Sequence, residues 1–146
     1  MAPLDAKAIL VLEMAMGVGL LIGAWLARLR RYRLHAWCQS TIVLINCALI
    51  AFTMIPPLRQ NVIPSLPSKL GKPTYGLATA HAALGTITEF AGLYVLLAAG
   101  TRVLPERLRI IRYKLWMRTV LVLWWATLLL GLATYARWHV PHLFSV

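Results

Sequence analysis

Residues 8–27 read AILVLEMAMGVGLLIGAWLA, a stretch of about twenty positions in which Glu13 is the single ionisable side chain. At about 1.5 Å per residue, a helix of this length crosses the roughly 30 Å of hydrocarbon in a bilayer. Three more apolar runs of similar length follow, at Ala36–Ile55, Leu77–Leu97 and Trp116–Tyr135. The sequence therefore predicts an all-α integral membrane protein, with residues 1–146 forming one transmembrane four-helix bundle.

The overall composition agrees with this prediction. Hydrophobic residues make up 60% of the 146 residues, and the mean hydropathy is +0.73. A soluble domain of this size would not carry so much apolar surface. The lipid membrane is therefore the expected environment of the chain.

The charges predict how the bundle is oriented. The chain has 15 Lys and Arg against 4 Asp and Glu, which gives a net charge of +11. Ten of the 15 basic residues lie between the first and second runs, or between the third and fourth runs and just inside the fourth, and five lie elsewhere. Because positively charged loops stay in the cytoplasm, we expect a multi-pass protein of the cell inner membrane with both termini on the outer face. Charges that flank spans meet anionic lipid first, so no nucleic-acid partner is expected.

The connections suggest two tandem helical hairpins. Arg31-Tyr32-Arg33-Leu34 precedes the second run, and the similar Arg112-Tyr113-Lys114-Leu115 precedes the fourth. The segment 56–76 contains five prolines, which exclude a regular helix, so we expect an ordered outer loop. A loop of this length is also where a soluble electron carrier could dock.

Small residues mark a packing face on the first run. They recur every four positions, at Ala15, Gly19, Gly23 and Ala27, and would let a neighbouring run or another subunit approach closely. Cys38 and Cys47 lie on opposite sides of the second run, so they cannot pair with each other, and we expect them to pack as small apolar residues.

Polar residues inside an apolar run need a specific reason, and the third run holds the most of them. Glu89 lies near the middle of that run, and Asn46 of the second run reaches a comparable depth. One interpretation is that a protonated Glu89 forms a hydrogen bond with Asn46 across a helix interface. The other is a path for protons or a quinone headgroup from the outer face to the midplane. Glu13 either reaches the outer interface or faces inward.

The histidines raise the question of a cofactor. A membrane-bound haem b takes two axial imidazoles from different helices at one depth. His81 lies near the outer boundary, and His139 and His142 end the fourth run on the same side, so a haem there is one interpretation. The alternatives are a structural His81, or a zinc or copper site that also uses Glu13. His35 has no second histidine on its side of the membrane, and we expect it to be an interfacial cation.

Three segments carry a resemblance to a known family. The segment Arg30–His35, and the blocks His81–Gly85 and Arg112–Arg118, resemble small bacterial four-helix membrane proteins, some of which are linked to maturation of haem-copper oxidases. The resemblance implies a setting near respiratory electron transport.

Three functional hypotheses follow. The first is a non-catalytic accessory or assembly subunit of a respiratory-type electron-transfer complex, which binds other membrane subunits. The second is a b-type cytochrome or quinone-reactive anchor, with His81 paired to His139 or His142. The third is a small proton-coupled transporter that uses Glu89 and Asn46. The sequence contains no nucleophile constellation, phosphate loop or cysteine-rich metal motif that would suggest a hydrolase or a nucleotide-dependent enzyme.

Overall fold

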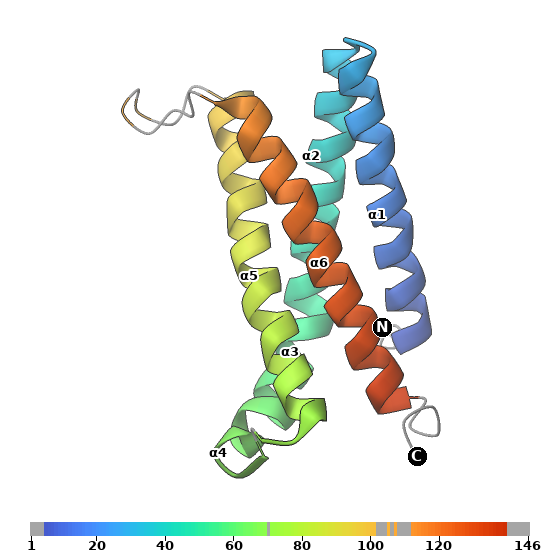
Figure 1. Cartoon of the computed structure of the whole chain (residues 1–146), viewed down its shortest axis with the longest axis vertical. Helices are drawn as coiled ribbons and strands as arrows, with labels where there is room; N and C mark the ends of the chain where they lie inside the picture. Colours follow the sequence, from blue (N-terminus) through green and yellow to red (C-terminus); the bar gives the residue numbers. More distant parts are fainter. Residues whose placement is uncertain (1–4, 70, 102–104, 106, 108–111, 140–146) are drawn as a thin grey trace.

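Four long helices make up most of the described part of the structure. The computed structural model describes residues 5–69, 71–101, 105, 107 and 112–139. Within these residues, 4 helices are long and apolar enough to cross a membrane. They are α1 (Ala6–Arg28), the helix that begins with α2 (Tyr32–Leu49) and runs to Ser65, α5 (Pro73–Gly100) and α6 (Tyr113–His139). Figure 1 shows them as one bundle, which confirms the predicted all-α architecture.

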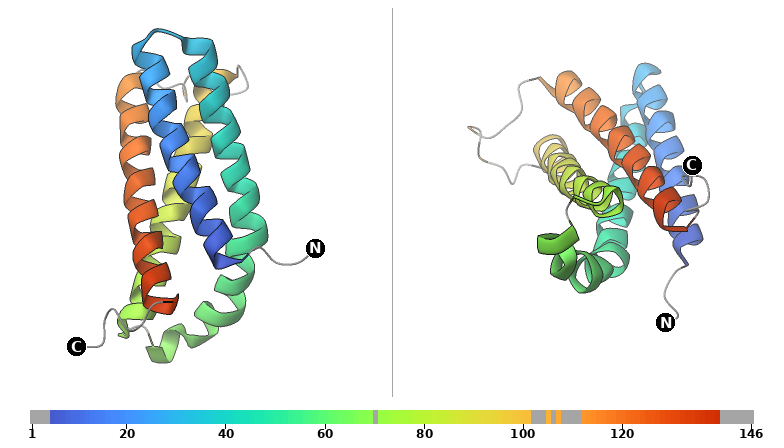
Figure 2. Two further views of the ribbon diagram at one scale, coloured as in Figure 1. Left: turned by 90° about the vertical axis from the view of Figure 1, so that its right-hand side faces the viewer. Right: turned by 60° about the horizontal axis from the view of Figure 1, so that its bottom comes forward.

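The helices pair as two hairpins. The largest contacts are between α5 and α6 and between α1 and α2, while α1 also packs on α6 and α2 on α5. The left view of Figure 2 shows α1 between α6 and α2, with α5 behind. Tyr32 and Tyr113, from the two similar basic segments, begin α2 and α6. The similar segments thus occupy the same position in each hairpin.

The two ends of the bundle differ. The turn from α1 to α2 lies at the same end as the last residue of α5 and the first residue of α6 (Figure 1), and we call this the basic end. Ala6 and His139 lie at the opposite end, together with the short helices α3 (Ile55–Pro57) and α4 (Leu66–Lys69). We call this opposite end the terminal end.

The proline-rich segment departs from the prediction. Residues 56–76 were expected to form a loop, but the helix that begins at Tyr32 continues to Ser65, through two π-helical segments, Ile50–Met54 and Leu58–Val62, and a 3₁₀ turn, Ile63–Ser65. Proline has no N–H to donate, so an unbroken α-helix is excluded here, as expected. The wider π turns accommodate Pro56 and Pro57 by shifting the hydrogen-bond register, so the chain bends without leaving the helical region. Between α4 and α5, the described non-helical residues are Gly71 and Lys72.

The core lies between the hairpins. Met16 and Leu20 of α1, Ile42 and Val43 of α2 and Trp124 of α6 form one buried cluster. Aromatic pairs join α5 to α6 near both ends, with ring centroids 5.9 Å apart in each pair; they are Tyr75–Trp138 and Tyr94–Trp116. Trp124 is therefore a core residue.

The outside of the bundle is apolar. Phe52 is 81% exposed, Trp37 72% and Phe90 69%. Such large apolar side chains are stable on the outside of a bundle when lipid surrounds it. Together with the four spans, they indicate a multi-pass membrane protein.

Candidate functional site

Glu89 lies at the centre of the polar interior. Its side chain on α5 is only 8% exposed, and both carboxyl oxygens accept hydrogen bonds from consecutive residues of α2. Asn46 Nδ2 donates to Oε2 at 2.8 Å, and Cys47 Sγ donates to Oε1 at 2.8 Å. The predicted bond between Asn46 and Glu89 is therefore present. Cys47, which we expected to pack as an apolar residue, is a hydrogen-bond donor.

This arrangement joins the two hairpins. Asn46 and Cys47 belong to the first hairpin and Glu89 to the second. A carboxyl group among apolar helices is expensive to bury unless its oxygens receive donors. Both oxygens do so here, and the bonds hold α2 against α5.

A second polar group connects α5 to α6. His81 Nδ1 lies 3.0 Å from the backbone oxygen of Thr127, and Thr88 Oγ1 lies 3.1 Å from Thr127 Oγ1. Because a carbonyl oxygen can only accept, Nδ1 of His81 carries the proton and donates it. The other ring nitrogen, Nε2, then keeps its lone pair when the imidazole is neutral.

Glu13 faces inward, as in the second of the two interpretations that the sequence left open. A methyl group placed on Gly131 of α6 would lie 3.7 Å from Glu13 Oε2, 2.9 Å from His81 Cε1 and 3.3 Å from His81 Nδ1. The carboxyl of α1 and the imidazole of α5 therefore border the same small space beside Gly131. Glycine is required there because a larger residue would push the imidazole away.

The structure does not bring His81 and His139 together. His81 lies level with Thr127, and His139 follows twelve positions later on α6, about 18 Å along the helix axis. His139 is exposed, and its ring stacks on Tyr135 at 4.5 Å between centroids. A shared haem needs two imidazoles at the same depth, and these two lie at different depths. His142 lies outside the described residues.

The metal alternative finds no support in the same region. Among the described residues, no three His, Cys, Asp or Glu side chains are grouped closely enough to hold a metal ion. Of the expected zinc or copper set, His81 and Glu13 border one space, His139 lies further along α6, and His142 is outside the described residues.

A row of polar side chains on α2 holds the backbone of α1. His35 Nδ1 donates to the oxygen of Gly23 at 2.8 Å, Cys38 Sγ to that of Gly19 at 3.4 Å, and Gln39 Nε2 to that of Leu20 at 3.2 Å. His35 thus binds the neighbouring helix, whereas we expected an interfacial cation among arginines. The spacing of His35, Cys38 and Gln39 at i, i+3 and i+4, opposite the small-residue face of α1, is the signal that could have revealed this row.

The small-residue face of α1 is used within the chain. A methyl group on Gly19 would lie 2.8 Å from Ile42 Cδ1, and one on Gly23 would collide with the side chain of Gln39. The first of the two expectations for this face, packing against a neighbouring run, is therefore confirmed, and the run is α2.

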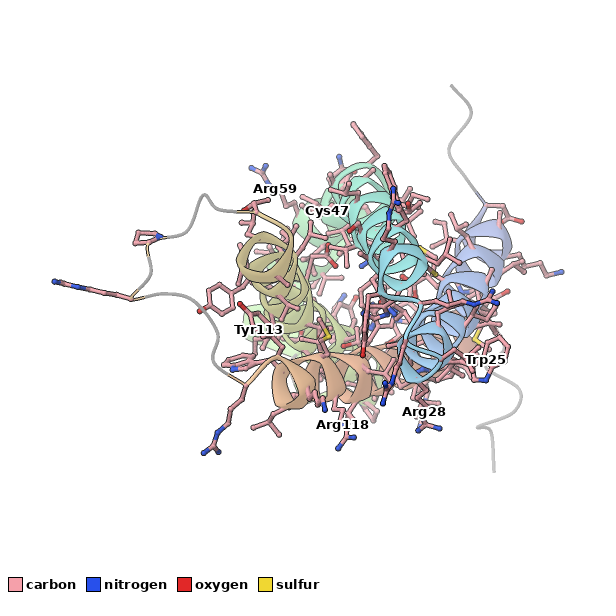
Figure 3. All side chains as sticks on the ribbon, turned by 90° about the horizontal axis from the view of Figure 1, so that it is seen from above. Trp25, Arg28, Cys47, Arg59, Tyr113 and Arg118 are labelled. Carbon is pink, nitrogen blue, oxygen red and sulfur yellow. The ribbon has the colours of Figure 1, made fainter. Side chains whose placement is uncertain are left out.

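Many of the described basic residues lie at the basic end, which is named for them. Figure 3 views the bundle from that end, and the labelled Arg28 and Arg118 extend away from the helices. Arg112, Lys114 and Arg118 line a shallow depression at the start of α6, together with Tyr113 and Leu115. Arg102 and Arg109 lie outside the described residues.

The chain was also compared with known proteins. Searches against protein-family models, curated proteins and solved structures gave no match.

Proposed function

We propose that this protein is an integral-membrane accessory or assembly subunit of a respiratory-type electron-transfer complex. The observation that carries the proposal is the double hydrogen bond of Glu89 with Asn46 and Cys47. A transporter or a quinone site would need this midplane carboxyl group to be available. Here both of its oxygens accept hydrogen bonds that hold α2 to α5. The buried polar groups at this depth then serve the architecture of a membrane scaffold.

The outer faces of the helices support the same proposal. Large apolar and aromatic side chains remain exposed on α2, on the π-helical segment and on α5, among them Trp37, Phe52 and Phe90. Aromatic residues of this kind are enriched in the interfaces between proteins. They offer surfaces for lipid and for larger membrane subunits.

The respiratory setting rests on the resemblance of Arg30–His35 and His81–Gly85 to small four-helix membrane proteins, some of them linked to haem-copper oxidase maturation. In this proposal the protein lies in the cell inner membrane with the basic end in the cytoplasm, because basic loops stay inside. The terminal end, with α3 and α4, then faces outward, where a soluble electron carrier could dock.

The test uses protein purified from its native membrane in a mild detergent. We expect larger respiratory subunits to co-purify, and the amount of assembled complex on a native gel to fall when the gene is deleted. We also expect the isolated chain to give no haem α-band in a reduced-minus-oxidised visible spectrum.

Each alternative function gives a different result. An α-band of the isolated chain that is lost in His81→Ala but kept in the control His139→Ala would overturn the scaffold proposal in favour of a cytochrome. Proton-coupled solute uptake into liposomes that is lost in Glu89→Gln would overturn it in favour of a transporter.

A further inference from the structure

Glu13 is the carboxyl group inside the bundle that the scaffold does not use. Glu89 has two donors, but Glu13, which is half-buried on a membrane-spanning helix, has no hydrogen-bond partner within the described part of the chain. An acidic side chain in this setting is costly and usually marks a function. The groups around it therefore decide what it can bind.

The imidazole of His81 borders the same space as Glu13. Both side chains contact the position that a methyl group on Gly131 would fill. The bond from His81 Nδ1 to the oxygen of Thr127 fixes the ring, so Nε2 is the nitrogen that remains free to take a proton. The carboxyl group of Glu13 and the imidazole of His81 are therefore two proton-accepting groups beside one glycine, and three helices hold them there.

The α1–α6 interface holds one more polar atom in need of a partner. Trp125 Nε1 is buried and has no acceptor among the described residues. The same ring packs within 3.5 Å of the position that a methyl group on Gly17 would occupy, one turn along α1 from Glu13. Polar groups of this kind are commonly satisfied by water inside proteins. A water molecule beside Trp125 would supply the missing acceptor at this interface.

We propose that Glu13 and His81 form a proton-binding pair inside the bundle, which exchanges its proton with water at the terminal end. A proton that arrives as hydronium binds to Glu13 Oε2 or His81 Nε2, and one water molecule leaves. The proton on His81 Nδ1 stays on the bond to Thr127. On α6, Tyr135 and His139 follow Gly131 at i+4 and i+8 and so lead from the pair toward the terminal end.

Other titratable groups on the packed elements are distinguishable from the pair. Glu89 lies about two turns away on α5 and is bonded to α2, and Lys7 is exposed on α1. The groups to be accounted for in a titration are, on α1, Lys7; on α2, Cys47; on α5, Glu89; and on α6, Tyr135 and His139. The inference does not rest on the accessory-subunit proposal, and it holds or fails whatever complex the protein joins.

The experiment is a pH titration of the full-length protein in lipid nanodiscs, followed by infrared difference spectroscopy. Glu13→Gln assigns the carboxyl band of Glu13, and His81→Gln assigns the imidazole band of His81. Because two interacting groups titrate in steps that belong to the pair, we expect each pH step of the unaltered protein to appear in both bands. Each substitution is expected to displace the step of the other group by about one pH unit or more.

Two glycine variants test the geometry. In Gly131→Ala the new methyl group fills the space between the two side chains, and we expect the step of each group to move toward the pH at which it titrates when the other group is removed. Gly85→Ala is the matched control on the same helix pair, where the methyl group would lie 3.3 Å from Thr127 Cγ2 and touch neither group. Glu89→Gln should also leave both steps unchanged.

The opposite results are equally clear. If the Glu13 band has the same pH dependence with and without His81, and the His81 band the same with and without Glu13, the groups are independent and the proposal is overturned. Far-ultraviolet circular dichroism and gel filtration identify any variant that fails to fold. The glycine pair then decides the question without changing either ionisable group.

Discussion

Arg30 adopts a left-handed backbone conformation, with φ of 58°, at the turn between α1 and α2. The amide of Arg30 donates to the oxygen of Ala27, and the amide of Arg31 donates to that of Leu26. These two bonds form a Schellman motif, in which glycine usually occupies the position that Arg30 holds here. A positive φ at a residue with a Cβ costs about 1 kcal/mol.

Arg30→Gly is therefore expected to be more stable than Arg30→Ala by about 1 kcal/mol. Both substitutions remove the same charge, but only glycine removes the clash of the Cβ with the backbone. The measurement is reversible unfolding in mixed micelles, followed by circular dichroism as the fraction of denaturing detergent rises. Equal stability of the two variants would contradict the role assigned to the left-handed turn.

Single side chains also mark the limit of what the sequence predicts. The bond between Glu89 and Asn46 was predicted because both residues are polar and lie at one depth. The inward direction of Glu13 and the donor role of Cys47 were not. A helix that is apolar on every side has no periodic pattern to show which face turns inward, so its rotation depends on its neighbours.

At the scale of elements, the α1–α2 hairpin depends on glycines that admit polar side chains. Gln39 binds the backbone oxygen of Leu20, and its side chain occupies the space beside Gly23. A methyl group at position 23 would displace the amide of Gln39 and break that bond. Interhelical hydrogen bonds to backbone are made here because no Cβ stands between the helices.

Gly23→Ala is expected to lower the free energy of unfolding by about 1–2 kcal/mol, through overpacking and the lost hydrogen bond. Gly92→Ala is the matched control, since its methyl group would lie at an ordinary 3.7 Å from Val43 Cγ2, and there we expect no loss. The same detergent unfolding measures both variants. In a Gln39→Ala background the cost of Gly23→Ala should largely vanish, and an unchanged cost would contradict the mechanism.

At the scale of the whole molecule, the four spans could be predicted because about twenty apolar residues leave few other structures open to a chain. The prediction of a loop at 56–76 was wrong for residues 56–65. We expected proline to end the helix at Ile55, but π-helical turns continue the helix to Ser65. The ends of the helices also extend beyond the apolar runs, as at Tyr32 and Gly100. Hydropathy marks where lipid begins, whereas the backbone hydrogen bonds of a helix continue past that boundary.

The orientation of the molecule leads to the last prediction. Ten of the 15 basic residues lie in the sequence between the first and second apolar runs, or between the third and fourth and just inside the fourth, so the basic end should face the cytoplasm. Single cysteines are introduced as Ser68→Cys near the terminal end and Thr101→Cys at the basic end, both exposed positions, in a Cys38→Ser, Cys47→Ser background that keeps a hydrogen-bond donor at each native site. In intact spheroplasts, a membrane-impermeant maleimide should label Ser68→Cys at once and Thr101→Cys only after permeabilisation. Labelling of Thr101→Cys in sealed cells, with Ser68→Cys protected, would mean that the bundle has the reverse orientation and that the positive charges do not determine it.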